Sequence, residues 1–320
     1  MMVGLISTGT WRVGAEYLIQ GVKWVDSTPL LDVVDIGSAR GELYRLNDEF
    51  LGLKVQPGPT YCLGRYSFVD VTGIEHIRCP DQLPSVANGQ CTNCAARDEF
   101  RFAHHFHTGG YAPDSLVAYM MQPHWLYVAT FGDATSKIGT AADVRKQSRL
   151  DEQGALAATY VGLAVDGKIA RFAEDTVTAR LNLRQTKRRS AKVAALAGML
   201  PHTEIEERHA ETVAAVLNLL RDVSARVPLE LLSKKWLPPP AFSVFLDSEP
   251  RTDWVAYPHA LSVGEHGFYV RGCAGPAALA RTSRDNDAPW FVVDVGALKG
   301  RRVIVGNYAS AEAMVQTALF

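Results

Sequence analysis

The sequence predicts an α+β protein in which a central α/β unit lies between two β-rich regions. Residues 1–75 and 253–306 are rich in β-branched and aromatic residues, with glycines and prolines between them. Residues 187–223 carry apolar side chains with a period of 3.6 residues, which indicates helix. Residues 125–139 read as two short strands around a polar, glycine-containing turn, which indicates a hairpin.

Composition narrows the class of protein. The chain has 320 residues, which is enough for one large domain or two to three small ones. We find no apolar run of about 18–20 residues and no basic stretch followed by an apolar one at the start, so we expect a cytoplasmic protein without a membrane partner. Five cysteines favour reduced thiols or metal ligands over a disulfide framework. A net charge of −1 means that any nucleic-acid partner needs a local basic patch.

Changes in composition divide the chain into five segments. They are an N-terminal β region (1–75), a zinc-ribbon segment (76–112), a central α/β domain (113–186), a helical segment (187–236) and a C-terminal β module (237–320). Within the central domain we expect a helix at 116–121, the hairpin at 125–139, a helix from about 141, a strand near 156–164 and a helix near 167–182. The stretch "LPPPAF" at 237–242 ends helix and predicts a linker. A short closing helix is expected at 309–319.

A short internal similarity links the two β regions. "VVDIGSARG" at 33–41 resembles "VVDVGALKG" at 292–300 in the valine pair, the aspartate and both glycines. One interpretation is a pair of related small β modules that flank the central domain. The other is that any strand followed by a glycine turn reads this way.

Cysteine spacing predicts a structural zinc site. His76-x2-Cys79 and Cys91-x2-Cys94 are two knuckles separated by a short loop, and such pairs supply two ligands each to a tetrahedral zinc ion. Zinc would also order a segment that has little apolar material of its own. His76 has the right spacing for the fourth ligand. The alternatives to it are His104, His105 and His107.

The hairpin and the helices after it resemble the GIY-YIG nuclease superfamily. "LYV" places Tyr127 at the first motif, and "KIG" places Lys137 and Gly139 at the second. "DVRKQSR" corresponds to the helix that carries an arginine, and "ARFAEDTV" supplies Glu174. The resemblance covers roughly 124–182 and implies a three-stranded α/β unit with phosphodiesterase chemistry.

A second resemblance is closer. An uncharacterised zinc-knuckle family has cysteine knuckles ahead of a "YLA…KVG" hairpin, then "R-W-x-DQGA" and an "IE" helix. This chain has "LYVAT", "KIG", "RLDEQGA" and "FAEDTV" in the same order and at similar spacing. Lysine in place of the second tyrosine is also found in that family. Because the family is uncharacterised, the resemblance to it implies no function.

The resemblance implies roles for Glu174 and two arginines. Glu174 lies at the edge of an apolar helical stripe and would hold one Mg2+ or Mn2+, with waters and substrate phosphate as the other ligands. Arg149 aligns with the arginine before "DQGA" and would stabilise the phosphate. Arg145 shares its helix face and is the reserve. In the wider superfamily this arginine falls near Gln147, so the chain departs from that pattern. Glu174 could instead be an ordinary solvent-facing helix residue paired with Arg171, three positions earlier.

Tyr127 and Lys137 would orient or activate the attacking water. Lys137 replaces a tyrosine and could take a proton only if burial or cationic neighbours lowered its pKa. Otherwise it would stay charged and hold phosphate, which gives weaker catalysis or binding without cleavage. Tyr127 could also be a packing residue of a half-buried strand.

A basic run follows the Glu174 helix. Residues 168–192 contain eight lysines and arginines against two acids, in an otherwise neutral protein. Such a band could follow a nucleic-acid backbone, although a solvated helix face is the common alternative. The predicted nucleic-acid contacts are Arg145, Arg184, Lys187, Arg188 and Arg189.

The sequence therefore predicts a metal-dependent, endonuclease-like phosphodiester hydrolase that acts on DNA or RNA. It would use Zn2+ as a structural ion and Mg2+ or Mn2+ as the catalytic ion. One alternative is a zinc-containing nucleic-acid-binding protein with a non-catalytic version of the same fold. Another is an enzyme that acts on a small molecule, because a fold does not determine a function.

Overall fold

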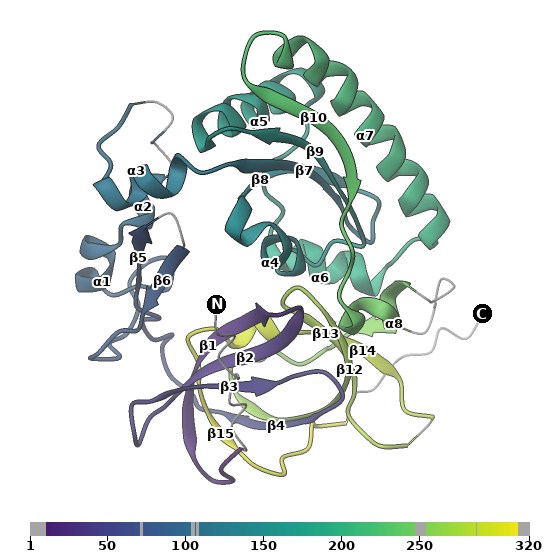
Figure 1. The fold of residues 1–320 in the computed structure, drawn as a ribbon. Coiled ribbons are helices and arrows are strands. Elements are labelled where there is room, and N and C mark those ends of the chain that lie inside the picture. Colours follow the sequence, from purple (N-terminus) through teal and green to yellow (C-terminus); the bar gives the residue numbers. More distant parts are fainter. Residues whose placement is uncertain are drawn as a thin grey trace.

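The computed structural model describes residues 11–70, 73–103, 106, 109–246, 254–285 and 287–312. It is an α+β fold with a nine-stranded sheet, a four-stranded sheet and a small two-stranded sheet (Figure 1). None of the helices in these ranges combines the length and the apolar character needed to cross a membrane.

Both ends of the chain contribute to the nine-stranded sheet, whose order is β11-β14-β13-β12-β4-β15-β1-β2-β3. The N-terminal strands are β1 (Glu16–Val25), β2 (Thr28–Asp35), β3 (Gly41–Arg45) and β4 (Phe50–Val55). The C-terminal strands are β11 (Trp254–Ala256), β12 (Gly264–Ala274), β13 (Ala277–Arg281), β14 (Trp290–Asp294) and β15 (Arg302–Val305). Strand β15 pairs with β1 on one side and β4 on the other. The prediction of two separate flanking modules is therefore wrong.

The two similar nine-residue segments do not share a conformation. After Asp35 the first segment turns, with Ala39 at a positive φ of 57°, and enters β3 at Gly41. After Asp294 the second segment forms the 3-10 helix η4 (Val295–Leu298). Only the strand ends correspond, which removes the interpretation as related modules.

The central sheet has the order β10-β9-β7-β8 and is antiparallel throughout. The predicted hairpin is confirmed as β7 (His124–Thr130) and β8 (Ser136–Ala142), and the predicted third strand is confirmed as β9 (Ala157–Ala164). The fourth strand, β10 (Leu229–Lys235), lies in the segment predicted to be helical. That segment otherwise forms α6 (Arg189–Ala197) and α7 (His202–Ser224).

The two faces of the central sheet have different partners. Leu126, Val128 and Ile138 point to one face and pack under α5 (Gly167–Leu181) and α7. Tyr127 and Ala129 alternate with them and belong to a core shared with the nine-stranded sheet. The helices α4 (Lys146–Asp151) and α6 lie between the two sheets (Figure 1), and the 3-10 helix η2 (Asp143–Arg145) directly precedes α4. The alternation of side chains along β7 thus separates two of the protein's cores, one on each face of the central sheet.

The cysteine-containing segment packs beside both sheets. It contains β5 (Arg65–Asp70), β6 (Gly73–Ile77), α1 (Thr92–Arg97) and α2 (Phe100–Ala103), and α3 (Asp114–Met120) follows it. Arg78 donates to Asp32 of β2 at 2.7 Å. A Cβ on Gly41 would lie 2.2 Å from the Arg78 guanidinium, so the absence of a side chain there leaves room for this contact. We call residues 61–103 the cysteine module.

The predicted linker at 237–242 ends in the 3-10 helix η3 (Pro240–Phe242), which is followed by α8 (Ser243–Leu246). Phe242 and Phe245 are fully buried, so this stretch is packed against the rest of the protein. Most of the predicted closing helix at 309–319 falls outside the described residues, and residues 309–312 form no helix.

Candidate functional site: a basic cleft beside a cysteine cluster

A cleft of about 710 Å³ opens where the nine-stranded sheet, the central α/β unit and the cysteine module meet. Seven cationic and two acidic side chains line it. The cations are Lys23, Arg145, Arg149, Lys187, Arg189, Lys192 and Lys299, and the acids are Asp32 and Glu152. We call it the basic cleft. On a chain with a net charge of −1, this is a strong local concentration of positive charge.

Only some of these cations are neutralised by acidic neighbours. Arg145 contacts Glu152 at 2.8 Å, and Arg189 contacts Asp294 at 3.0 Å. Across the described part of the chain, Arg149, Lys192 and Lys299 have no carboxylate within 4.0 Å. Burial, followed by the charges of neighbouring cations, lowers the pKa of Lys192 to about 7. Excess positive charge that is partly removed from water favours a bound anion.

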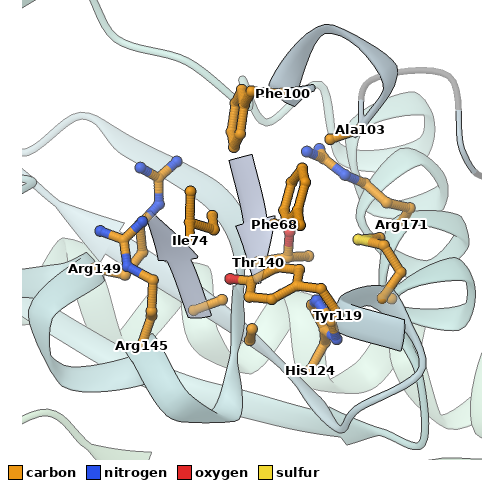
Figure 2. Close-up of a pocket in the computed structure, with 14 residues that line it drawn as sticks. Phe68, Ile74, Phe100, Ala103, Tyr119, His124, Thr140, Arg145, Arg149 and Arg171 are labelled. Carbon is orange, nitrogen blue, oxygen red and sulfur yellow. The ribbon is translucent and has the colours of Figure 1, made fainter. Parts of the chain in front are cut away.

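A smaller pocket of about 100 Å³ adjoins the basic cleft and shares Ile74, Phe100, Arg145 and Arg149 with it. We call it the aromatic pocket. Figure 2 shows Arg145 and Arg149 on one side, Arg171 on the other, and aromatic rings between them. The rings are Phe68, Phe100 and Tyr119. This pocket could not be predicted from the sequence, because its rings come from two separate segments in which each aromatic residue resembles an ordinary packing residue.

The predicted catalytic residues on the hairpin are buried. Tyr127 is fully buried, and its hydroxyl has no hydrogen-bond partner among the described residues. The Nζ atom of Lys137 lies 5.5 Å from the centre of the Tyr127 ring and donates to the carbonyl of Gln185 at 3.3 Å. Lys137 is 5% exposed. Burial and the nearby Arg149 charge lower its pKa to about 8.

Glu174 lies on α5, which begins with the Asp166 side chain accepting from the Ile169 N–H at 2.8 Å. It is 2% exposed, and its Oε2 contacts Arg171 at 2.6 Å. Burial raises the pKa of Glu174, while the charges of Arg171 and Lys137 oppose that rise. Glu174 is therefore a buried carboxylate paired with Arg171: the pairing agrees with the alternative interpretation of the sequence, whereas its expectation of a solvent-facing side chain is wrong.

Tyr127, Lys137, Arg149 and Glu174 come together behind the basic cleft. The charges of Arg149 and Glu174 both act on the pKa values of Tyr127 and Lys137. Arg149 is exposed and is the one member of the four among the cleft-lining residues. The other three form the layer beneath it.

This group does not fit a resident magnesium or manganese ion. Such ions prefer several oxygen ligands. Glu174 is a single carboxylate whose oxygen is already bound to Arg171, with Lys137 and Arg149 nearby. Within the described ranges, the one cluster of three or more metal-ligating side chains is formed by cysteines.

The predicted nucleic-acid contacts divide into two sets. Arg145, Lys187 and Arg189 line the basic cleft. Arg184 and Arg188 are exposed and lie outside its lining. The carbonyl of Arg184 accepts from the Ile138 N–H at 3.0 Å, so that residue extends the edge of the central sheet through its backbone.

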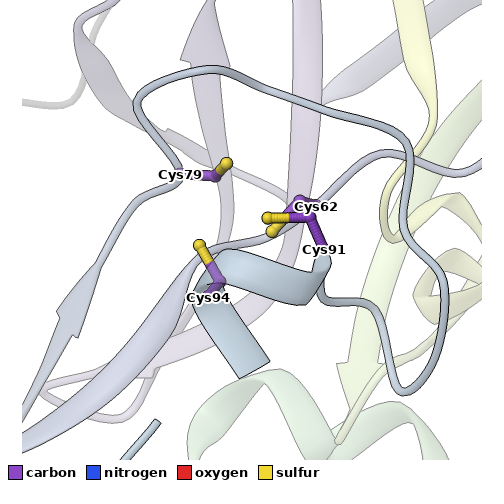
Figure 3. A group of neighbouring side chains, drawn as sticks. All are labelled: Cys62, Cys79, Cys91 and Cys94. Carbon is purple, nitrogen blue, oxygen red and sulfur yellow. The ribbon is translucent and has the colours of Figure 1, made fainter. Parts of the chain in front are cut away.

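The cysteine cluster consists of Cys62, Cys79, Cys91 and Cys94, all buried (Figure 3). Their sulfur atoms all lie within 4.8 Å of one another. A tetrahedral site with Zn–S bonds near 2.3 Å needs sulfur atoms about 3.8 Å apart, so the cluster fits a metal such as zinc. The hydrogen bond from the Cys94 backbone N–H lowers the pKa of Cys91 to about 7. A thiolate, the form that binds metal, is thereby favoured.

Cys62, and not His76, is the fourth member of the cluster. His76 contacts the carbonyl of Leu63 through Nε2 at 2.7 Å and stacks on Tyr66. Cys62 precedes Cys79 in the chain and reads as part of a strand. The glycine in the "CLG" triplet was a sequence signal that the chain turns directly after Cys62. Gly64 has a φ of 101°, and a Cβ there would lie 2.1 Å from the Ile77 carbonyl. The alternative ligands His104, His105 and His107 lie outside the described residues.

Comparison of the chain with protein-family models, with curated proteins and with solved structures finds no match. The function is therefore inferred from the chain's own residues. Two features carry chemistry: the basic cleft with its adjoining aromatic pocket, and the buried group of four thiols.

Proposed function

We propose that this protein binds nucleic acid in the basic cleft and that a zinc ion on the four cysteines holds the module that forms one wall of the cleft. The proposal is carried by the seven cationic side chains that line a single cleft of a nearly neutral protein. The phosphates of nucleic acids are common biological anions that bind to such a cluster of cations, because each contact releases a counterion and so favours binding.

The distribution of the cations favours a polymer over a single small anion. Lys23 lies on β1, Arg149 on α4 and Lys192 on α6, and Lys299 follows η4. Cations from four separate elements suit a chain of phosphates that passes along the cleft. Arg149 and Lys192, which have no acidic partner, are the strongest candidates for direct phosphate contact.

Binding should be measured by fluorescence anisotropy with labelled DNA and RNA of about 20 nucleotides, at salt concentrations between about 50 and 200 mM. The variant Lys192→Gln/Lys299→Gln removes two cleft charges and should reduce the slope of log K against log salt by about two. The matched control, Arg184→Gln/Arg188→Gln, removes two exposed charges outside the cleft and should change the slope less. Equal effects of the two variants would contradict binding in the cleft.

Hydrolysis of the phosphodiester is a second candidate function. It is supported by the proximity of Tyr127, Lys137 and Glu174 to Arg149, which borders the cleft. Arg149 would bind the scissile phosphate. Lys137 has a pKa of about 8, so near neutral pH a fraction of it is unprotonated and can accept a proton. The Glu174–Arg171 ion pair would have to open before Glu174 could take part.

Cleavage should be assayed with and without added Mg2+ or Mn2+, comparing wild type with Glu174→Gln. The control is Asp175→Asn, which changes the neighbouring exposed acid on the same helix. Loss of cleavage in Glu174→Gln alone would support the hydrolase. Absence of cleavage in all three proteins, with nucleic-acid binding retained, would leave binding as the function.

A further inference from the structure

The cysteine module and the rest of the basic cleft's lining differ in chemistry, and from this difference we infer that the ligand of the cleft is single-stranded nucleic acid whose bases stack on the cysteine module. The inference rests on the proposed function, since it names the class of nucleic acid that the cleft takes. The lysines and arginines of the cleft come from outside the cysteine module. The module itself contributes only Tyr66, Ile74, His76 and Phe100.

The aromatic side chains of the module are placed where they can meet a base. Tyr66 is 37% exposed and Phe100 is 38% exposed, although both are large apolar residues. The Tyr66 ring stacks on His76 with centroids 4.9 Å apart and planes at 26°, so contact with His76 on one face fixes the orientation of the Tyr66 ring. Aromatic side chains with exposed faces next to a cationic groove are the two components of general single-strand recognition.

The adjoining aromatic pocket extends this arrangement. The rings of Phe68 and Phe100 are nearly parallel, with an interplanar angle of 10° and centroids 6.2 Å apart. The pocket of about 100 Å³ has room for one planar ring, while Arg145 and Arg149 border it on the side shared with the cleft (Figure 2). A terminal or unpaired base can therefore enter it while its phosphate stays on the arginines.

A duplex does not match these walls. The phosphates of a duplex lie on the outside of both strands, and its base faces are covered by stacking. A cleft that binds a duplex is therefore expected to have cations on both sides. Here the cations come from outside the cysteine module, and the module contributes aromatic rings but no lysine or arginine to the lining. An unpaired strand presents phosphates on one side and free base faces on the other, which suits this arrangement.

The test compares four probes of equal length: single-stranded DNA, single-stranded RNA, a DNA duplex and a single-stranded oligonucleotide made of abasic nucleotides. The abasic strand has the same phosphates and no bases. Wild-type protein should bind the single strands about fivefold or more tightly than the abasic strand, as expected for the loss of at least one stacked base. It should also prefer the single strands to the duplex.

The variants Tyr66→Ala and Phe100→Ala should bring binding of the single strands down to the abasic level and leave the salt dependence unchanged. Tyr66→Phe keeps the ring and should behave as wild type. Phe172→Ala removes an exposed ring on α5 that is not part of the cleft lining, and is the matched control. Thermal unfolding of each variant checks that it is folded.

The outcomes separate this inference from the proposed function. If wild type binds the base-bearing and abasic strands equally, and Lys192→Gln/Lys299→Gln weakens both, the stacking inference is wrong and binding in the cleft stands. If the lysine variant changes nothing, the proposed function itself fails. A preference for the duplex over the single strands would also overturn the inference.

Discussion

The ring of Tyr127 on β7 lies across Gly139 on β8. The two residues are paired in the antiparallel ladder, and a Cβ on Gly139 would lie 2.5 Å from both Cζ and the hydroxyl oxygen of Tyr127. The glycine of the "KIG" motif is therefore required by the position of the tyrosine in "LYV". This contact also places Tyr127 beside Lys137, its diagonal neighbour on the same face.

Gly139→Ala should destabilise the protein, because the added methyl group forces the buried Tyr127 ring out of place. Overpacking of this kind costs about 1–3 kcal/mol in the free energy of unfolding. Urea denaturation measures the loss, and Gly198→Ala, where the nearest atom would be 3.7 Å away, is the control. In a Tyr127→Leu background the cost of Gly139→Ala should fall, whereas additive effects would show that the contact is not the cause.

Purified protein should contain about one zinc ion per chain, measured by metal analysis. Cys62→Ser should lose most of this zinc, since it removes one of four thiolate ligands. His76→Ala should keep it, because the His76 ring contacts Leu63 and lies outside the cluster. Cys273→Ala, at a buried cysteine in β12, is the control for cysteine substitution in general. Zinc content well below one in wild type would refute the site.

Nucleic-acid affinity should fall as the pH rises above about 7. Free Lys192 has its pKa lowered to about 7, and a phosphate beside it would raise that pKa, so binding takes up a proton. The contribution of Lys192 to the affinity is largest below pH 7, where the lysine is already charged, and it is lost progressively as the pH rises above 7. Calorimetry in buffers of different ionisation enthalpy detects the proton uptake. Lys192→Arg, which stays charged, should flatten the profile; an unchanged profile would exclude Lys192 as its source.

Stability should fall between pH 7 and pH 5 in a manner that depends partly on His209. This residue on α7 is buried, and its two ring nitrogens contact the hydroxyls of Thr130 and Thr159 at 2.8 Å. Burial lowers the pKa of His209, so below the unfolded value of about 6.5 the unfolded chain binds a proton that the native protein does not. Stability from this group is complete above pH 6.5 and decreases as the pH falls.

The measurement is urea unfolding of wild type and His209→Gln at pH 7 and pH 5. A single proton changes the free energy of unfolding by up to about 1.4 kcal/mol per pH unit. The variant should be less stable at pH 7 and should show a shallower pH dependence. The control is His202→Gln at the start of the same helix. Parallel pH profiles for wild type and His209→Gln would show that His209 does not contribute to the pH dependence of stability.

Local patterns in the sequence determined much of the central unit. The alternation around Tyr127 and the glycine-containing turn specify the hairpin, and the apolar period from Ile169 specifies α5, because both patterns depend on residues only a few positions apart. The knuckle spacing identified Cys91 and Cys94 for the same reason. These predictions need no knowledge of which distant segments meet.

Tertiary structure decided everything that depends on distant pairing. Strand β15 inserts between β1 and β4, and β10 joins β9, because backbone groups at a sheet edge bond to whichever strand reaches them. Cys62 became the fourth thiol through a turn at Gly64. Lys137 and Glu174 are a lysine and a glutamate of ordinary sequence context, yet burial and the nearby charges of Arg149 and Arg171 shift their pKa values. Sequence by itself determined the hairpin, β9 and α5, whereas only packing determined the electrostatic environment in which a site acts, since burial and charge proximity are properties of residues far apart in the chain.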